Sequence, residues 1–259
     1  MSDYLGVVSK NFTPYLDSLK DDYIARKDKS FFWPSGTQVY CGRQGTGKTI
    51  SAVYHVMNLK KRYPAMILVS NLVINGMTSR DFHSKRELLD ILGSSDFDPM
   101  TEYIFFKSMD QLSFALVGVN NAFKGVVYLI DEIHTYFNAL DSKNIPMYIF
   151  TEISQQRKQR KLIIGTSQVF KRMALPFREQ CDNLIFCKTY LGILTIQKVY
   201  FGDDYKTDSN DRVTSPSRKS GFFFHTRKIR NFYDTYQKVV SGVEQYEQIL
   251  MIPQPLKSK

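Results

Sequence analysis

The chain has 259 residues, of which 43% are hydrophobic and 14% aromatic, a composition that supports a buried core and excludes global disorder. Its formal net charge of +10 favours a polyanionic partner such as nucleic acid or an acidic membrane surface, although a basic soluble protein without such a partner has the same composition. The sequence contains no apolar run of about 18 residues, so no transmembrane helix is expected. The three cysteines lack metal-binding spacing and are expected to be reduced thiols in a cytoplasmic protein.

The first 34 residues form a mixed, charged lead-in to the first core strand. The aromatic residues near its end, Phe31 to Trp33, either pack under the sheet or line an adenine pocket. Residues 37–41 are a short β-rich run, and residues 50–59 carry apolar side chains at near-helical spacing. The sequence therefore predicts a strand and a helix on either side of residues 42–49.

Residues 42–49 read Gly-Arg-Gln-Gly-Thr-Gly-Lys-Thr, a complete Gly-x-x-x-x-Gly-Lys-Thr phosphate-binding loop. Its glycines allow backbone N–H groups to turn towards a triphosphate, and the following helix points its positive end at the same anion. Lys48 can reach the β- and γ-phosphates, and Thr49 can offer its hydroxyl to Mg²⁺. The candidate nucleotide-binding residues are Gly42, Arg43, Gln44, Gly45, Thr46, Gly47, Lys48 and Thr49.

The middle of the chain alternates between strands and helices. Apolar runs at residues 65–70, 103–106, 125–130 and 162–166 are typical of parallel strands that are buried on both faces. Residues 147–161 predict a helix that ends in a basic cluster. This alternation predicts an α/β fold with a doubly wound, mostly parallel central sheet flanked by helices, and with ligands at the carboxyl ends of its strands.

After about residue 182 the pattern changes to shorter segments. Residues 185–186, 193–196 and 199–201 are typical of short strands or hairpin arms, and residues 203–220 predict a polar, turn-rich loop. We therefore predict a C-terminal β-rich extension. It belongs to one P-loop domain of residues 35–252, after which residues 253–259 form a tail.

An acidic pair, Asp131 and Glu132, directly follows the predicted strand of residues 125–130. An acid at the end of that strand can support Mg²⁺ beside the phosphate-binding loop, and the next acid can orient and polarise a water molecule. The alternative is an acidic pair that only caps a helix. Transfer to a substrate hydroxyl needs no acid that activates water, so the pair favours hydrolysis over a kinase reaction.

Gln168 ends the predicted strand of residues 162–166. A polar side chain there can lie between the metal site and the γ-phosphate and sense which nucleotide is bound, whereas the alternative is a plain turn. The sensor interpretation places this strand between the strand that precedes Asp131 and the strand that precedes the phosphate-binding loop.

Residues 155–161 form a basic cluster that has three interpretations. Arg157 or Arg160 can act as an arginine finger that enters a neighbouring subunit's site, or the cluster can contact DNA phosphates. The third interpretation is a solvated helix end with favourably placed cations. Arg178 is a further finger candidate.

Taken together, these motifs resemble the HerA/FtsK branch of P-loop ATPases, a RecA/FtsK-like (ASCE) fold. Within it, the chain is most similar to the group that holds zonula-occludens-toxin-like (Zot) proteins of filamentous phages and genome-packaging ATPases of tailless, membrane-containing viruses. Three smaller segments, residues 69–72, 177–182 and 231–236, also resemble this group, and the resemblance spans about residues 38–236.

The resemblance implies ATP and Mg²⁺ as cofactors, with Mg²⁺ support from Thr49 and Asp131. It implies catalysis by Glu132 with Lys48, and sensing by Gln168. It also implies a finger arginine that is Arg157, Arg160 or Arg178. Since finger arginines act between subunits, the expected assembly is a homo-oligomeric ring, a pentamer or a hexamer.

Three functions compete. The first is an ATP-driven motor that moves double-stranded DNA into a viral capsid, located in the host cytoplasm and associated with the virion at a capsid vertex. The second is a Zot-like assembly or secretion ATPase that works with a membrane channel, and the third is a small-molecule kinase. In the DNA motor, a basic stretch would make sequence-independent contacts to DNA phosphates. The alternative interpretation of this stretch is a solvated surface loop. The stretch contains Arg212, Arg218, Lys219, Arg227, Lys228 and Arg230.

Overall fold

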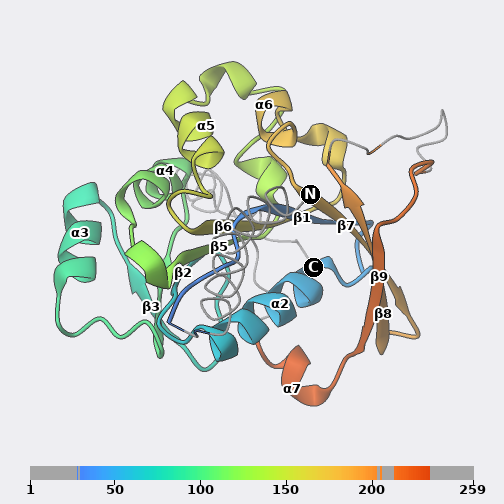
Figure 1. Cartoon of the computed structure of the whole chain (residues 1–259), viewed down its shortest axis with the longest axis horizontal. Coiled ribbons are helices and arrows are strands. Elements are labelled where there is room, and N and C mark those ends of the chain that lie inside the picture. The colour runs from blue at the N-terminus through green and yellow to red at the C-terminus, as the bar shows by residue number, and fades with distance from the viewer. Residues whose placement is uncertain (1–27, 29, 203–204, 206–212, 234–259) are drawn as a thin grey trace, which may run out of the picture.

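The computed structural model describes residues 28, 30–202, 205 and 213–233. Their strands form one sheet in the order β3-β4-β2-β5-β6-β1-β7-β8-β9. The strands from β3 to β7 in this order are parallel, and β8 and β9 add an antiparallel hairpin at one edge (Figure 1). Their bounds are β1 (Gly36–Cys41), β2 (Ile67–Ser70), β3 (Thr78–Asp81), β4 (Glu102–Phe105), β5 (Val126–Ile130), β6 (Lys161–Ser167), β7 (Asn183–Tyr190), β8 (Leu194–Phe201) and β9 (Lys219–Phe224).

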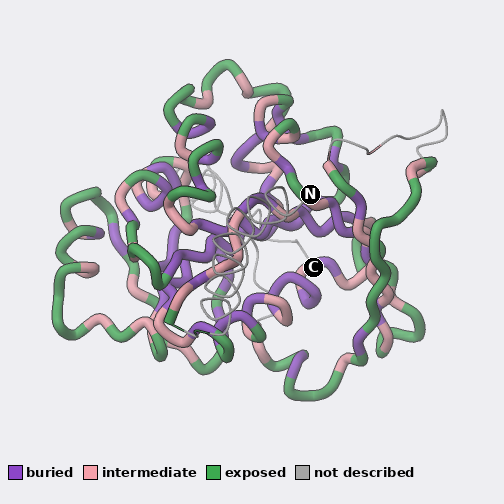
Figure 2. The backbone as a smooth tube through the Cα atoms, in the orientation of Figure 1, coloured by how far each residue is buried: buried purple, intermediate pink, exposed green. Residues whose placement is uncertain are grey.

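The helices cover both faces of the parallel strands, as a doubly wound fold requires. Helix α2 lies on one face, and the opposite face carries α4, α5 and α6 (Figure 1). The central strands are buried throughout, whereas much of the surface of α3 is exposed (Figure 2). The helix bounds are α2 (Lys48–Arg62), α3 (Lys85–Gly93), α4 (Met109–Gly118), α5 (Met147–Ser154), α6 (Leu175–Arg178) and α7 (Arg227–Arg230).

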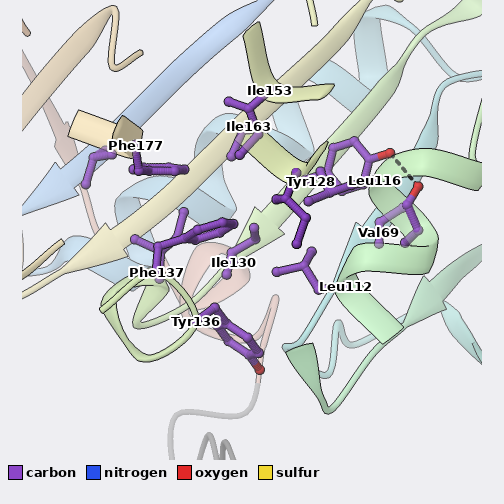
Figure 3. Packing of buried hydrophobic residues seen from close by; sticks show 14 of the residues in the cluster. Val69, Leu112, Leu116, Tyr128, Ile130, Tyr136, Phe137, Ile153, Ile163 and Phe177 are labelled. Carbon is purple, nitrogen blue, oxygen red and sulfur yellow. Dashed lines mark hydrogen bonds between the residues drawn. The ribbon is translucent and has the colours of Figure 1, made fainter. Parts of the chain in front are cut away.

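Alternating side chains of the central strands supply two separate cores. On the α4–α6 face, Tyr128 and Ile130 of β5 pack with Phe137 and Phe177 (Figure 3). The rings of Phe137 and Phe177 stack with centroids 4.7 Å apart. The neighbouring residues of β5 point to the other face, where they pack with the apolar side of α2. The rigid sheet that results fixes the positions of the loops at its carboxyl edge.

The predicted fold class is confirmed, and the strand β6 lies between β5 and β1, as the sensor interpretation of Gln168 required. The C-terminal β-rich extension is confirmed as the antiparallel arrangement of β7, β8 and β9. The predicted helix of residues 147–161 is too long. Helix α5 ends at Ser154, turns follow, and β6 begins at Lys161, where the side chain is buried beside Glu152.

The lead-in is described only in part. The tail of residues 253–259 and half of the loop of residues 203–220, including Arg212, lie outside the described residues. Strand β3 and helices α3 and α4 were not predicted. Strand β3 is a polar edge strand with no apolar alternation, so its sequence carries little signal. Both helices start at a serine whose hydroxyl accepts a backbone N–H three residues on, a capping signal that the sequence does contain.

Candidate nucleotide-binding site

The phosphate-binding loop, residues 42–49, connects the end of β1 to the start of α2. Gly42, Gly45 and Gly47 all adopt positive φ angles, which glycine tolerates best. A Cβ atom on Gly47 would collide with the hydroxyls of Thr189 and Thr195. The loop is therefore held in a compact shape that this glycine pattern permits. Lys48 is buried and donates from Nζ to the carbonyl of Arg43 over 3.4 Å.

Asp131 follows β5 and faces the loop across a short polar network. The hydroxyl of Thr49 donates to Oδ1 of Asp131 over 2.9 Å, and the hydroxyl of Thr166 donates to the same oxygen over 2.6 Å. Asp131 is only 9% exposed, so these bonds act in a largely water-free environment. The candidate metal ligands, Thr49 and Asp131, are thus brought together.

Asn71 fixes the backbone of Asp131. Its Oδ1 accepts the N–H of Asp131 over 2.8 Å, and its Nδ2 donates to the carbonyl of the same residue over 3.0 Å. Asn71 directly follows β2, the neighbour of β5 in the sheet. The segment of residues 69–72, noted for its resemblance alone, therefore has a physical role: it clamps the residue that carries the carboxylate.

Glu132 adopts a left-handed conformation with φ 48°, which costs a non-glycine residue energy. The N–H of Glu132 donates to the hydroxyl of Thr166 over 3.0 Å. Gln168 Nε2 lies 3.5 Å from Glu132 Oε1, and His134 Nδ1 lies 3.2 Å from Glu132 Oε2. The structure thus brings Gln168 to Glu132 and adds His134, which was not predicted as a site residue.

His134 is held between Glu132 and Ser167, with 3.4 Å between its Nδ1 and Ser167 Oγ. Burial lowers the pKa of His134, and the charges of Arg172 and Lys48 lower it further, against the opposing effect of Glu132. At 3.2 Å, a neutral imidazole contacts the carboxylate of Glu132 without neutralising its charge.

A cavity of about 720 Å³ opens over the phosphate-binding loop, large enough for a nucleotide. One side is formed by the loop with Asp131 and Glu132, and the other side by the C-terminal extension. The lining residues from the extension are Thr189, Gly192, His225, Arg230 and Tyr233. Sequence reasoning missed this second side because its residues come from separate segments without a nucleotide motif.

The predicted finger arginines lie outside this cavity. Arg157 is exposed on the turn before β6, at the amino ends of the strands. Arg160 is engaged within the chain, since its guanidinium stacks 3.8 Å from the Phe31 ring centroid and donates to the carbonyl of Phe32 over 3.2 Å. Arg178, on α6, has a buried Nε without a hydrogen-bond acceptor among the described residues and lines a smaller cavity.

The alternative of an adenine pocket at Phe31 to Trp33 is wrong. Phe32 is fully buried against Tyr63, with ring centroids 5.1 Å apart, and the segment precedes β1. It therefore lies at the edge of the sheet opposite the phosphate-binding loop. The packing interpretation of these aromatic residues is confirmed.

Residues 37–222 match the family model of zonular occludens toxin (Zot). The chain belongs to the Zot family. With a complete phosphate-binding loop, the acidic pair after β5 and a P-loop fold, this Zot-family chain is a P-loop ATPase. No curated protein matches the sequence.

The fold is also similar to solved structures, at low identity. The N-terminal domain of zonular occludens toxin from Neisseria meningitidis is 13% identical with a TM-score of 0.48, over 77% of this chain and 99% of that one. The genome packaging NTPase B204 from Sulfolobus turreted icosahedral virus 2, in complex with sulfate, is 12% identical with a TM-score of 0.48, over 70% and 95%. The same NTPase in complex with ATP-gammaS is 12% identical with a TM-score of 0.49, over 70% and 96%.

Two further findings concern membrane-spanning helices and cysteines. In the described part, no helix is long and apolar enough to cross a membrane. All three cysteines, Cys41, Cys181 and Cys187, are buried. Burial raises the pKa of Cys41 well above its usual range, which keeps this thiol unreactive beside the phosphate-binding loop.

Proposed function

We propose that this Zot-family ATPase is a motor that couples ATP hydrolysis to the movement of double-stranded DNA, in the packaging of a viral genome. The observation that carries the ATPase part is the convergence of Thr49, Asp131 and Glu132 at one edge of the sheet. The DNA part is supported by the net charge of +10 and by the resemblance to HerA/FtsK-type motors.

In this proposal, hydrolysis divides among the chain's own residues. Lys48 and the N–H groups of the phosphate-binding loop bind the phosphates and neutralise negative charge on the γ-phosphate. Glu132 accepts a proton from the water that attacks the γ-phosphorus, while the bond to the leaving ADP oxygen breaks. Gln168, in contact with Glu132, is the proposed sensor of the γ-phosphate.

The donor set at this edge suits Mg²⁺, which prefers hard oxygen ligands and is held by one or two protein groups together with substrate phosphates. Thr49 and Asp131 would hold the ion, which supplies positive charge to the phosphates when bound. In the structure their side chains already share a hydrogen bond, and the carboxylate has a neighbouring hydroxyl from Thr166.

DNA would be held by sequence-independent contacts to its phosphates. Within the described residues, exposed basic side chains lie on β7, β8, β9 and α7 and on the residue before β9, in the extension that also lines the nucleotide cavity. We propose that this region faces the DNA in a homo-oligomeric ring. A finger arginine would then act in trans, which accords with the position of Arg157 and Arg178 outside their own chain's cavity. Apart from Arg230, these exposed basic residues are Lys188, Lys198, Arg218, Lys219, Arg227 and Lys228.

The test is the ATPase rate of the full chain with and without double-stranded DNA over a salt series. We expect DNA to stimulate hydrolysis and the stimulation to fade as salt rises, because counterion release drives the contact. The variant Lys198→Glu, at an exposed position of β8, should weaken the stimulation while the rate without DNA stays unchanged. An ATPase rate that ignores both DNA and salt would refute the DNA part and leave the hydrolase part standing.

A second candidate is a Zot-like assembly or secretion ATPase that acts on a membrane channel. It is favoured by an apolar groove of about 390 Å³ on β8 and β9. Phe222 and Phe224 in this groove are 70% and 58% exposed, as side chains that bind another protein often are. Sedimentation with host membranes, without retention on DNA, would favour this candidate over the DNA motor.

A further inference from the structure

The segment after β9, residues 225–233, borders the nucleotide site and connects the hairpin to the loop after β2, and we call it the strap. It leaves the hairpin at His225, forms α7 beside α2 (Figure 1) and ends in a bridge between Tyr233 and Ile74. The N–H of Asn75 donates to the carbonyl of Phe232 over 2.8 Å. The strap is therefore fixed to the loop that follows β2.

An apolar contact anchors the middle of the strap. Ile229 is buried against Ile50, the residue after Thr49, and against Phe223 of β9. The ring of Phe223 stacks on Tyr54 of α2 with centroids 4.8 Å apart. Because Ile50 directly follows the phosphate-binding loop, the strap is packed onto the first turn of α2 rather than lying loosely over it.

A chain of hydroxyl groups ties the strap to the phosphate-binding loop itself. Thr189 donates to the carbonyl of Thr46 over 2.9 Å, and its hydroxyl lies 2.6 Å from that of Thr195. The Thr195 hydroxyl lies 2.6 Å from His225 Nε2. Thr195 is fully buried, so this chain of contacts is shielded from water. The strap is thereby placed relative to the phosphate-binding loop.

Arg230 is the strap's charged contribution to the cavity and the one arginine among its lining residues in the described part of the chain. Its Nη2 donates to the carbonyl of Gly192 over 2.6 Å, which holds the side chain at the turn between β7 and β8. Among the described residues, no carboxylate forms an ion pair with Arg230. Within the described part of the chain, the guanidinium thus retains unused donors and has no ion-pair partner, beside the same cavity as Lys48.

We propose that Arg230 binds the polyphosphate of the nucleotide within its own subunit, so that the strap forms the second side of the site. This inference rests on the proposed nucleotide binding. It adds a residue that lies outside the phosphate-binding loop of residues 42–49. It also replaces the DNA contact expected of Arg230 from the basic stretch. The planar guanidinium suits phosphate oxygens, and with one donor committed to Gly192 the others are free to bind them.

The test compares wild type, Arg230→Ala and Arg230→Lys as full chains, by calorimetric titration with ATP, ADP and adenosine. Arg86→Ala, an exposed arginine on α3 outside the cavity, controls for the loss of one positive charge. We expect Arg230→Ala to weaken ATP binding about ten-fold or more, ADP binding less, and adenosine binding not at all. Arg230→Lys should recover part of the loss, and Arg86→Ala should match wild type.

Three outcomes would overturn the proposal. Equal ATP affinity in wild type and Arg230→Ala would show that the guanidinium does not touch the nucleotide. An equal loss for ATP and adenosine would place it on the base or ribose instead. A loss of DNA affinity with unchanged ATP affinity would restore the DNA contact.

If the wild type bound no ATP at all, the proposed function itself would fail, a result that is distinct from all three. Equal melting temperatures of the variants exclude misfolding as the cause.

Discussion

The hydroxyl of Thr49 donates to Oδ1 of Asp131 over 2.9 Å, although 82 positions separate the two residues in the chain. One ends the phosphate-binding loop after β1 and the other follows β5, and β6 lies between these two strands. Thr166 of the intervening strand completes the contact with its bond to the same carboxylate oxygen. The sheet order therefore brings the two candidate metal ligands together at one edge of the sheet.

Asp131→Asn should abolish Mg²⁺-supported hydrolysis. The amide retains an oxygen that accepts from Thr49 and Thr166, so the fold is preserved, but the negative charge that attracts the cation is lost. We expect the ATPase rate to fall about 100-fold or more, and the Mg²⁺ concentration needed for half-maximal rate to rise. Asp141→Asn, at an exposed acid in the segment before α5, is the matched control and should behave as wild type. A normal Mg²⁺ dependence in Asp131→Asn would contradict the assignment.

Glu132→Gln should separate binding from chemistry. The amide cannot accept a proton from water, so kcat should fall by about 10² to 10⁴ while ATP stays bound. Rapid-quench measurements would then find trapped, unhydrolysed ATP. The control is Glu179→Gln, an exposed position on the surface after α6. A kinase that transfers phosphate to a small molecule would be far less affected, and that outcome would count against hydrolysis.

His134→Ala tests whether the imidazole positions Glu132. With 3.2 Å between His134 Nδ1 and Glu132 Oε2, its removal frees a carboxylate that sits on a strained backbone. We expect kcat to drop about ten-fold with KM unchanged, and His134→Asn to recover part of the rate through its amide donor. A rise in KM together with a lower melting temperature would indicate a structural role instead.

Gly47→Ala and Gly45→Ala form a matched pair within the phosphate-binding loop. Both glycines have positive φ, 82° and 77°, but a Cβ on Gly47 meets the hydroxyls of Thr189 and Thr195, whereas a Cβ on Gly45 meets nothing within 4 Å. Each substitution costs about 1–3 kcal/mol of backbone strain, and Gly47→Ala adds the steric collision. Denaturant melts should therefore show the larger loss for Gly47→Ala. Equal losses of unfolding free energy in the two variants would mean that a Cβ at position 47 does not collide with the hydroxyls of Thr189 and Thr195.

How far the sequence predicts this site depends on whether a residue belongs to a local motif. Lys48, Thr49 and Asp131 were predicted because a phosphate loop and an acid after an apolar strand are short, contiguous signals. Asn71 was noted only as part of a segment that resembles the family. Its hydrogen bond to the backbone of Asp131, after the neighbouring strand, has no local signal in the sequence.

The sequence predicts less about residues whose surroundings depend on long-range packing. For Arg160 it left three interpretations open, a finger, a DNA contact and a solvated helix end, and the structure places this residue at φ 52° against Phe31. Arg230 looked like part of a basic stretch, and only the path of the strap brings it to the nucleotide cavity. No local pattern encodes either outcome, because each depends on a partner that is distant in the sequence.

The last prediction concerns acid stability and His55 on α2. Its Nδ1 lies 2.9 Å from the Tyr40 hydroxyl, and burial lowers its pKa below the ordinary value of 6.5. Above that value both folded and unfolded chains hold a neutral imidazole. Below it, His55 binds a proton in the unfolded chain but stays neutral in the folded chain. Stability is therefore lost as the pH falls from 6.5 towards the pKa of His55 in the folded chain. Melting temperatures measured between about pH 7.5 and pH 5.5 should therefore decrease.

His55→Gln should flatten this decrease, because the amide does not titrate and can still accept from Tyr40. The slope should not vanish, since burial also lowers the pKa values of His134 and His225 with the same sign. His83→Gln, at an exposed position before α3, is the control and should keep the wild-type slope. If His55→Gln kept it too, His55 would not be the source of the acid sensitivity, and the decrease in melting temperature would be assigned to His134 and His225 instead.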